Sequence, residues 1–149
     1  VMSDRIALLR SGELEQVATP REIYSRPATA YVAQFIGHTN LMKGEVRAGT
    51  VRCGAMSWRA ELPDGPALFS LRPEHIRVAQ SPPTPAVVRV RGHLLHQAFH
   101  GATELIRVAA DGGMVLMMRV PSGSSLSDHL EIEFSTADAV AVRESPDRI

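Results

Sequence analysis

Three histidines occur close together in the second half of the chain, in the order His93-x-x-His96-x-x-x-His100. Imidazole is a common ligand of zinc and other transition metals. On a regular strand, however, His93 and His96 project to opposite faces, because side chains alternate along a strand. A shared ion would need a bulge between them, and a closed zinc site needs three or four converging ligands. We therefore interpret these histidines as solvated side chains and predict no metal site.

A candidate cationic stripe is formed by four arginines in the same half of the chain: Arg89, Arg91, Arg107 and Arg119. Such a stripe could bind an anion or an RNA backbone, as OB-like barrels do. Aromatic side chains for base stacking are scarce, at 5% of the residues, and the formal net charge is zero. We predict a charged, solvated outer face and no nucleic-acid partner. Glu131 and Glu133 are interpreted in the same way.

The remaining candidates, a lone cysteine and a phosphate-binding loop, do not indicate a catalytic or nucleotide-binding site. Cys53 has no histidine or aspartate partner in a recognisable arrangement, so we predict no nucleophile. A single cysteine excludes an internal disulfide and is typical of a reducing compartment. The phosphate-binding pattern G-x-x-x-x-G-K-[ST] does not occur. The residues themselves therefore predict no catalytic, cofactor-binding or metal-binding group.

Length and hydropathy limit the class of protein. At 149 residues the chain fits one domain, or one domain with an appendage. No apolar run approaches the ~20 residues of a membrane span, and residues 1–4 lack the features of a signal peptide. These features favour a soluble cytoplasmic protein.

The first elements expected are a hairpin and two short helices within residues 4–37. Strands carrying Ile6 and Leu8, then Leu14 and Val17, surround a turn in which Gly12 can take positive φ. Residues 19–22, Thr-Pro-Arg-Glu, form a helix start: a capping threonine, proline at the first helical position and a glutamate that completes a capping box.

That helix should end before Pro27. A second helix is expected to carry Tyr31, Val32, Phe35 and Ile36 on one stripe and to stop at Gly37.

From Leu41 onward, short apolar runs alternate with turn signals, which favours a small β-sandwich or barrel. Residues 51–62 are interrupted by Gly54, so we expect a poor or bulged strand pair there. A proline-rich linker at residues 81–85 is expected to divide the β part into two similar halves. The other strands are expected at residues 41–46, 67–71, 76–78, 87–97, 103–109, 115–120, 130–134 and 140–142.

These residues also carry a resemblance to a family. Asp4-Arg5-Ile6-Ala7, Ser11-Gly12, Gln16, Thr19-Pro20-x-Glu22-Ile23-Tyr24, Pro27, Val32-Ala33-x-Phe35-Ile36-Gly37 and Asn40 resemble the end of the nucleotide-binding domain in ATP-binding subunits of ABC importers. The similar subunits belong to maltose-, polyamine-, sulfate- and ferric-iron-type systems. Leu71-Arg72-Pro73-Glu74-x-Ile76 is similar to the Arg-Pro-Glu signature of that family's C-terminal extension, the TOBE domain.

The resemblance implies a mainly β fold: an OB-like TOBE barrel or sandwich, preceded by the hairpin and two short helices from the end of the nucleotide-binding domain. The implied divisions are residues 1–37 for that domain's tail, 38–143 for the TOBE domain and 144–149 for a disordered tail. Two stretches depart from the family pattern, Phe99-His100-Gly101 and Ser127-Asp128-His129. Gly37-His38-Thr39-Asn40-Leu41 is closer to polyamine- and iron-type members.

The function implied is that of a regulatory and dimerising region of an importer subunit that couples ATP hydrolysis to solute uptake. ATP and Mg²⁺ would bind upstream, where the Walker A and B, signature and switch-histidine motifs belong, so this chain alone should be inactive. Its partners would be a second ATPase subunit, the transmembrane permease subunits and a small-molecule effector. It would lie in the cytoplasm, on the inner face of the membrane.

Without the upstream domain, Ile6, Leu8, Val32, Phe35 and Ile36 are expected to be partly bare and to favour a homodimer. The alternative is a free-standing OB-like module that binds a small ligand or nucleic acid. The hairpin and helices of residues 4–37 argue against it, because such a module has no use for them.

Overall fold

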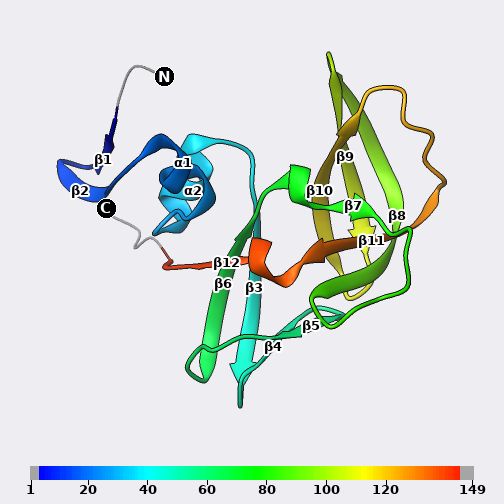
Figure 1. The fold of residues 1–149 in the computed structure, drawn as a ribbon, viewed down its shortest axis with the longest axis horizontal. Coiled ribbons are helices and arrows are strands. Elements are labelled where there is room, and N and C mark those ends of the chain that lie inside the picture. Colours follow the sequence, from blue (N-terminus) through cyan, green and yellow to red (C-terminus); the bar gives the residue numbers. More distant parts are fainter. Residues whose placement is uncertain (1–3, 145–149) are drawn as a thin grey trace.

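The structure, a computed structural model, describes residues 4–144, so nearly all of the tail predicted at 144–149 lies outside it. It is mainly β, with one two-stranded hairpin, two five-stranded sheets and two short α-helices (Figure 1). The elements are, in chain order, β1 (Ile6–Arg10), β2 (Glu13–Ala18), α1 (Pro20–Ser25), α2 (Ala30–Ile36), β3 (Asn40–Arg47), β4 (Thr50–Cys53), β5 (Met56–Arg59), β6 (Gly65–Leu71), η1 (Pro73–His75), β7 (Arg77–Val78), β8 (Val87–His100), β9 (Thr103–Ala110), β10 (Met114–Pro121), β11 (His129–Ser135), η2 (Thr136–Asp138) and β12 (Val140–Val142).

The predicted hairpin and helix starts are confirmed. Ser11 and Gly12 both have positive φ, 50° and 80°, in the tight turn between β1 and β2. The Thr19 side chain accepts a hydrogen bond from the amide of Glu22 at 3.2 Å, so α1 begins as expected. Helix α2 ends at Ile36, but Gly37 is extended, with φ of 173°, and the chain simply runs on towards β3.

A small core of its own lies under the hairpin and is built from Leu8, Ala18, Ile23 and Val32. The prediction that Leu8 and Val32 would be bare is therefore wrong, because β1 and α2 cover each other's apolar faces. The prediction that Phe35 would be partly bare is confirmed, because 63% of it is exposed, and the centre of its ring lies 5.9 Å from that of Tyr31. Ala33 faces inward instead.

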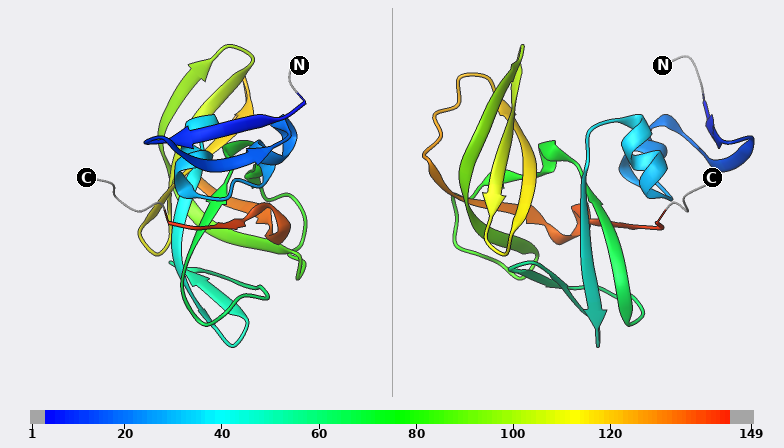
Figure 2. Two further views of the ribbon diagram at one scale, coloured as in Figure 1. Left: turned by 90° about the vertical axis from the view of Figure 1, so that its left-hand side faces the viewer. Right: turned by 180° about the vertical axis from the view of Figure 1, so that it is seen from behind.

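The two large sheets exchange strands across the proline linker. Their strand orders are β12-β6-β3-β4-β5 and β10-β9-β8-β11-β7. Strand β7 precedes the linker but joins the second sheet, and β12 comes last but joins the first. The linker therefore does not separate two halves, which corrects the expectation from composition. Trp58 of the first sheet packs edge-on against Phe69 and Phe134, so both sheets share one core. In the right-hand view of Figure 2, β3 and β6 lie between the helix pair and the strands β8, β9 and β10.

The irregular strand is not where the sequence predicted it. Strands β4 and β5 pair regularly from Thr50↔Arg59 to Cys53↔Met56, because Gly54 lies in the turn with φ of 56° and interrupts neither strand. Register shifts lie instead in β1, between Leu8 and Leu9, and in β8, where the register with β9 shifts between Leu94 and His96. The longest helix within residues 4–144 is α2, with seven residues, and none of the described helices could span a membrane.

Candidate functional site

Arg72 links the helix pair to the sheets. It follows β6 directly and is only 3% exposed. Its guanidinium donates to the carbonyl oxygens of Tyr24 (3.0 and 3.3 Å), Ala33 (2.9 Å), Gly37 (3.3 Å) and His38 (3.1 Å). Carbonyls in the last turn of a helix lack partners within the helix and carry partial negative charge. One side chain of the β part therefore caps the C-terminal ends of both helices.

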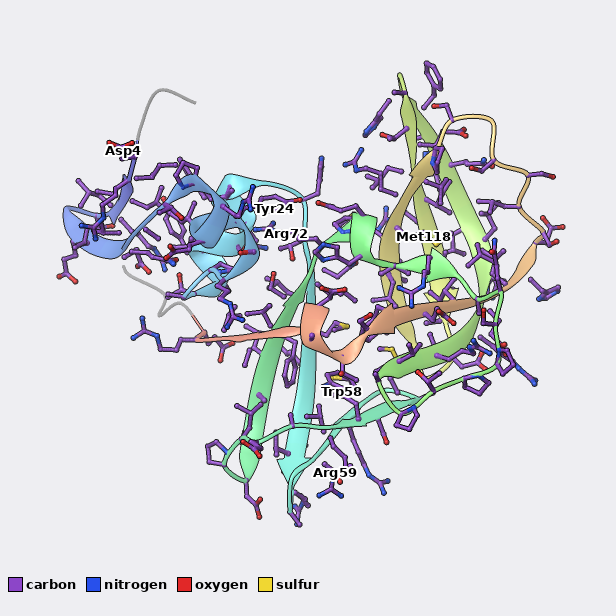
Figure 3. The ribbon with its side chains drawn as sticks, in the orientation of Figure 1. Asp4, Tyr24, Trp58, Arg59, Arg72 and Met118 are labelled. Carbon is purple, nitrogen blue, oxygen red and sulfur yellow. The ribbon has the colours of Figure 1, made fainter. Side chains whose placement is uncertain are left out.

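Tyr24 lies beside this guanidinium (Figure 3), and Glu74 lies beside both of them. The Cζ atom of Arg72 lies 4.3 Å from the centre of the Tyr24 ring, a cation–π geometry, and the Tyr24 hydroxyl donates to Glu74. Burial, together with this hydrogen bond, raises the pKa of Tyr24 to about 12. Burial opposes ionisation of Glu74, but the Tyr24 hydrogen bond and nearby cations outweigh it and lower the pKa of that carboxyl. Burial also lowers the pKa of Arg72.

The end of the described chain makes a second attachment to the helix pair. Arg143, just after β12, donates its amide to Ala28 at 3.0 Å and accepts at its carbonyl from the Ala30 amide at 2.9 Å. Between the two attachments lies a hollow of about 590 Å³, lined in part by Arg26, His75 and Asp138. The two attachments hold the helices at two separated points.

A larger groove, of about 690 Å³, opens where β7 meets the end of β10. Its apolar lining includes Ile76, Val78 and Val120, and Arg119 lies beside it. Glu74 also lines this groove, although its carboxylate is the acceptor for Tyr24. The groove and the junction therefore share one side chain.

The histidines meet only one condition for a shared ion. The bulge in β8 pairs His93 with Ala109 and His96 with Arg107, two positions apart on β9, so both imidazoles project from the same face. His129 of β11 lies directly opposite His93. Even so, no three potential metal ligands gather within residues 4–144.

The four arginines do not form one stripe. The Arg89 guanidinium bonds Glu133 at 2.6 Å, while Arg91 lies 3.7 Å from Glu131. Arg91, whose side chain is 82% exposed, lies on the solvated outer face that the sequence predicted, whereas the Arg89 side chain is only 17% exposed and corrects that prediction. Arg107 lies on β9 and Arg119 on β10, and Arg119 lines the larger groove together with Glu131 and Glu133.

Glu133 corrects the expectation of a solvated acidic face. It is 6% exposed and is held between Arg89 and Arg77, whose Nη2 atom lies 2.8 Å from its Oε2 atom. The hydrogen bond from Arg89 is the largest cause that lowers the pKa of Glu133; burial works against it.

Sequence reasoning noticed Arg72 only as part of a family signature and missed its structural role. The available signal was its position, a single guanidinium between the apolar strand Phe69-Ser70-Leu71 and a proline. A charged residue in such a place is buried only where partners satisfy its donors.

The sequence of this chain is similar to those of known import proteins. Residues 69–148 match the family model of the TOBE domain. The spermidine/putrescine import ATP-binding protein PotA of Thermobifida fusca is 36% identical over 141 residues, which cover 86% of this chain and 37% of that protein. The sn-glycerol-3-phosphate import ATP-binding protein UgpC 3 of Agrobacterium fabrum is 32% identical over 128 residues, covering 84% and 36%. The chain thus spans little more than a third of the length of these curated relatives.

Among solved structures, the cytoplasmic molybdate-binding protein ModG is similar, with a TM-score of 0.59 over 70% of this chain and 95% of that one. At 12% identity this likeness concerns the fold alone, and it agrees with the predicted OB-like β architecture. The family match spans more than half of the chain, and the relatives named above are importer ATP-binding proteins. The chain belongs to the TOBE domain family, in the group found in the ATP-binding subunits of ABC importers.

Proposed function

We propose that this chain is the C-terminal regulatory region of an importer ATP-binding subunit, and that Arg72 couples the nucleotide-binding part to the TOBE domain. The division at residues 37 and 38 is part of this proposal. The observation that carries it is the capping of both helices by one buried guanidinium. Rotating the helix pair against the sheets would break all of these bonds and leave a charge buried without partners, which is costly.

The whole subunit would couple ATP hydrolysis to solute uptake, with ATP and Mg²⁺ held outside this chain. The relatives that are named as spermidine/putrescine import proteins, together with Gly37-His38-Thr39-Asn40-Leu41, favour a polyamine-type system over an iron-type one. The relative named for sn-glycerol-3-phosphate import shows that other solutes also occur at similar identity.

A small-molecule effector that binds in the groove at β7 and β10 would act on the junction through Glu74. The groove at β7 and β10 is lined by Glu74, whose carboxylate accepts from Tyr24, and the Tyr24 ring faces Arg72. A ligand that draws Glu74 into the groove would free the Tyr24 hydroxyl. The helix pair would then be held less tightly.

The assembly is proposed to be a homodimer of ATP-binding subunits, docked on permease subunits at the inner face of the membrane. Light scattering of the chain at several concentrations tests the part of this assembly that the chain itself can make. A constant monomer mass up to high concentration would show that the β part does not pair by itself.

The decisive experiment uses the complete gene product that contains this chain, assembled with its permease in vesicles. Arg72→Ala should leave ATP binding intact and lower the solute transported per ATP hydrolysed, because the two parts move independently. Arg52→Ala, an exposed arginine on β4, is the matched control. Unchanged coupling in Arg72→Ala would contradict the coupling role, and a gene product without ATPase activity would contradict the assignment itself.

The chain alone is expected not to bind Mg-ATP in calorimetry, because it has no phosphate-cradling loop. A stoichiometric isotherm would mean that nucleotide is held by residues other than those motifs. The alternative function, a free-standing OB-like module that binds a small ligand or nucleic acid, does not explain why Arg72 is bonded to the ends of both helices.

A further inference from the structure

The end of the second sheet presents an outward face centred on Arg107. On β9, Arg107 is paired with His96 of β8 on one side and with Met117 of β10 on the other. Directly paired residues project to the same face of an antiparallel sheet. Their neighbours along the strands, including Ile106, Val108, Leu116 and Met118, are buried in the core, so this face points away from it. The Arg107 face, as defined here, comprises His96, Ala98, Leu105, Arg107, Val115, Met117 and Arg119.

The bulge in β8 decides which side chains this face carries. A one-residue slip moves side chains to the other side of a sheet. Without the register shift between Leu94 and His96, the imidazole of His96 would not lie beside Arg107. The strands β8, β9 and β10 that form this face lie at the end of the molecule away from the hairpin of β1 and β2 (Figure 1).

Charge distinguishes this face from the arginine ladder beside it. Arg89 and Arg91 are matched by Glu131 and Glu133, whereas the seven positions of the Arg107 face carry no carboxylate, and only Arg119 among them lies near one, that of Glu74. Arg119 donates to the hydroxyl of Thr103 at 3.1 Å. The nearest acidic residue on β9 is Glu104, which accepts from the Gly123 amide and projects to the other side.

The rest of the face is apolar and partly uncovered. Val115 is 46% exposed, and Leu95, at the bulge beside the face, is 51% exposed. Arginine and methionine among apolar neighbours are typical of the buried part of protein–protein interfaces. None of the seven positions carries phenylalanine, tyrosine or tryptophan, which disfavours single-stranded nucleic acid because its bases need stacking platforms.

We propose that the Arg107 face is a docking surface for an acidic polypeptide segment. Its carboxylates would pair with Arg107 and Arg119, and an apolar side chain would pack on Met117 and Val115. Strand addition at the centre of β10 is blocked, since Asn40 already bonds both backbone groups of Met117. The partner therefore binds through side chains. Arg119, at one end of this surface, also lines the groove that contains Glu74 of the junction, whereas Arg107 and its neighbours on β8 and β9 do not. The proposal does not depend on the function proposed above.

The test uses the complete 149-residue chain and a peptide probe of glutamates interrupted by two leucines. Two further probes have glutamine in place of glutamate, or are oligouridine RNA. Amide chemical shifts map where each probe binds, and fluorescence anisotropy gives its affinity. Arg107→Glu should weaken binding of the acidic peptide about fivefold or more, and added salt should weaken it further. Arg47→Glu, an equally exposed change on the first sheet, should not.

Shifts confined to Ala98, Leu105, Arg107, Val115 and Met117, with loss in Arg107→Glu only, support the proposal. Equal loss in Arg47→Glu would overturn it, since attraction would then depend on net charge alone. Tighter binding of RNA at the same residues would also overturn it in favour of a nucleic-acid surface. Arg107→Gln, which adds no charge, shows whether a change in Arg107→Glu reflects misfolding: its spectrum should match that of the unmodified chain away from β9.

Discussion

The side-chain amide of Asn40 bonds both backbone polar groups of Met117. Its Nδ2 atom donates to the Met117 carbonyl at 2.8 Å, and its Oδ1 atom accepts from the Met117 amide at 2.7 Å. The same Nδ2 atom donates to the Leu71 carbonyl at 3.2 Å. Asn40 begins β3 in the first sheet, and Met117 lies in β10, the edge strand of the second. A side chain of one sheet thus takes the place of a neighbouring strand for the other.

Asn40→Leu should therefore destabilise the chain strongly. Asn40 is 5% exposed, so the substitution leaves Met117 with buried polar groups that water cannot reach easily. The expected loss is roughly 2–4 kcal/mol of unfolding free energy, because each unsatisfied buried group costs about 1–3 kcal/mol. Urea denaturation measures it. Gln97→Leu, an exposed amide on β8, is the control and should change stability by less than about 0.5 kcal/mol.

Local signals in the sequence predicted the local structure. Each of these signals depends on residues that are close together in the sequence, so the sequence alone is enough to predict them. They are the turn at Ser11 and Gly12, the cap at Thr19 and the break before Pro27. Asn40 and Met117 are joined only by the fold, as are Arg72 and the ends of both helices. The sequence has no signal for such pairs, because either partner alone looks like an ordinary polar or apolar residue.

The two helix caps offer a second test. Thr19→Ala removes the acceptor of the Glu22 amide and should cost about 1 kcal/mol. Thr29→Ala should cost more, because the Thr29 hydroxyl both accepts from the Val32 amide and donates to Glu15, and the residue is 6% exposed. Thermal unfolding of the two variants measures the order. Equal losses would mean that the bond to Glu15 contributes nothing.

Cys53 provides a third test. Its side chain is fully buried, and burial raises the pKa of the thiol to about 11. The thiolate is the reactive form, so an aromatic disulfide reagent at about pH 8 should not modify the folded chain. In denaturant one thiol should react at once. Rapid modification of the folded chain would show that β4 and β5 open readily, and Cys53→Ser gives the background.

The bulge in β8 and the burial of Glu133 could not be predicted from the sequence, because both depend on how strands that are distant in sequence pair. Residues 129–135 alternate as an ordinary strand does. In residues 93–100 the adjacent Leu94 and Leu95 break the alternation, but such a pair does not by itself indicate a register shift. Glu131 and Glu133 look alike in sequence, yet Glu133 lies between arginines of two strands, β7 and β8, whereas both arginines near Glu131 belong to β8. The pairing of strands that are distant in sequence determines which carboxylate is enclosed.

That difference gives a prediction of pH dependence. The hydrogen bond from Arg89 lowers the pKa of Glu133 in the folded chain below its value in the unfolded chain. The unfolded chain therefore takes up this proton first as the pH falls, and the folded state loses stability below about pH 4.5. Glu133→Gln should be less stable than the unmodified chain at neutral pH. The gap should close as the pH falls through the folded-state pKa, because both side chains are then uncharged.

Glu131→Gln is the matched control, since its side chain is 44% exposed and its contacts to Arg89 and Arg91 are longer, at 3.4 and 3.7 Å. Exposed ion pairs contribute between zero and about 1 kcal/mol, so this variant should stay close to the unmodified chain at every pH. Urea denaturation of all three chains between neutral and acidic pH measures both gaps. A gap for Glu133→Gln that stays constant with pH would show that its charge does not stabilise the fold.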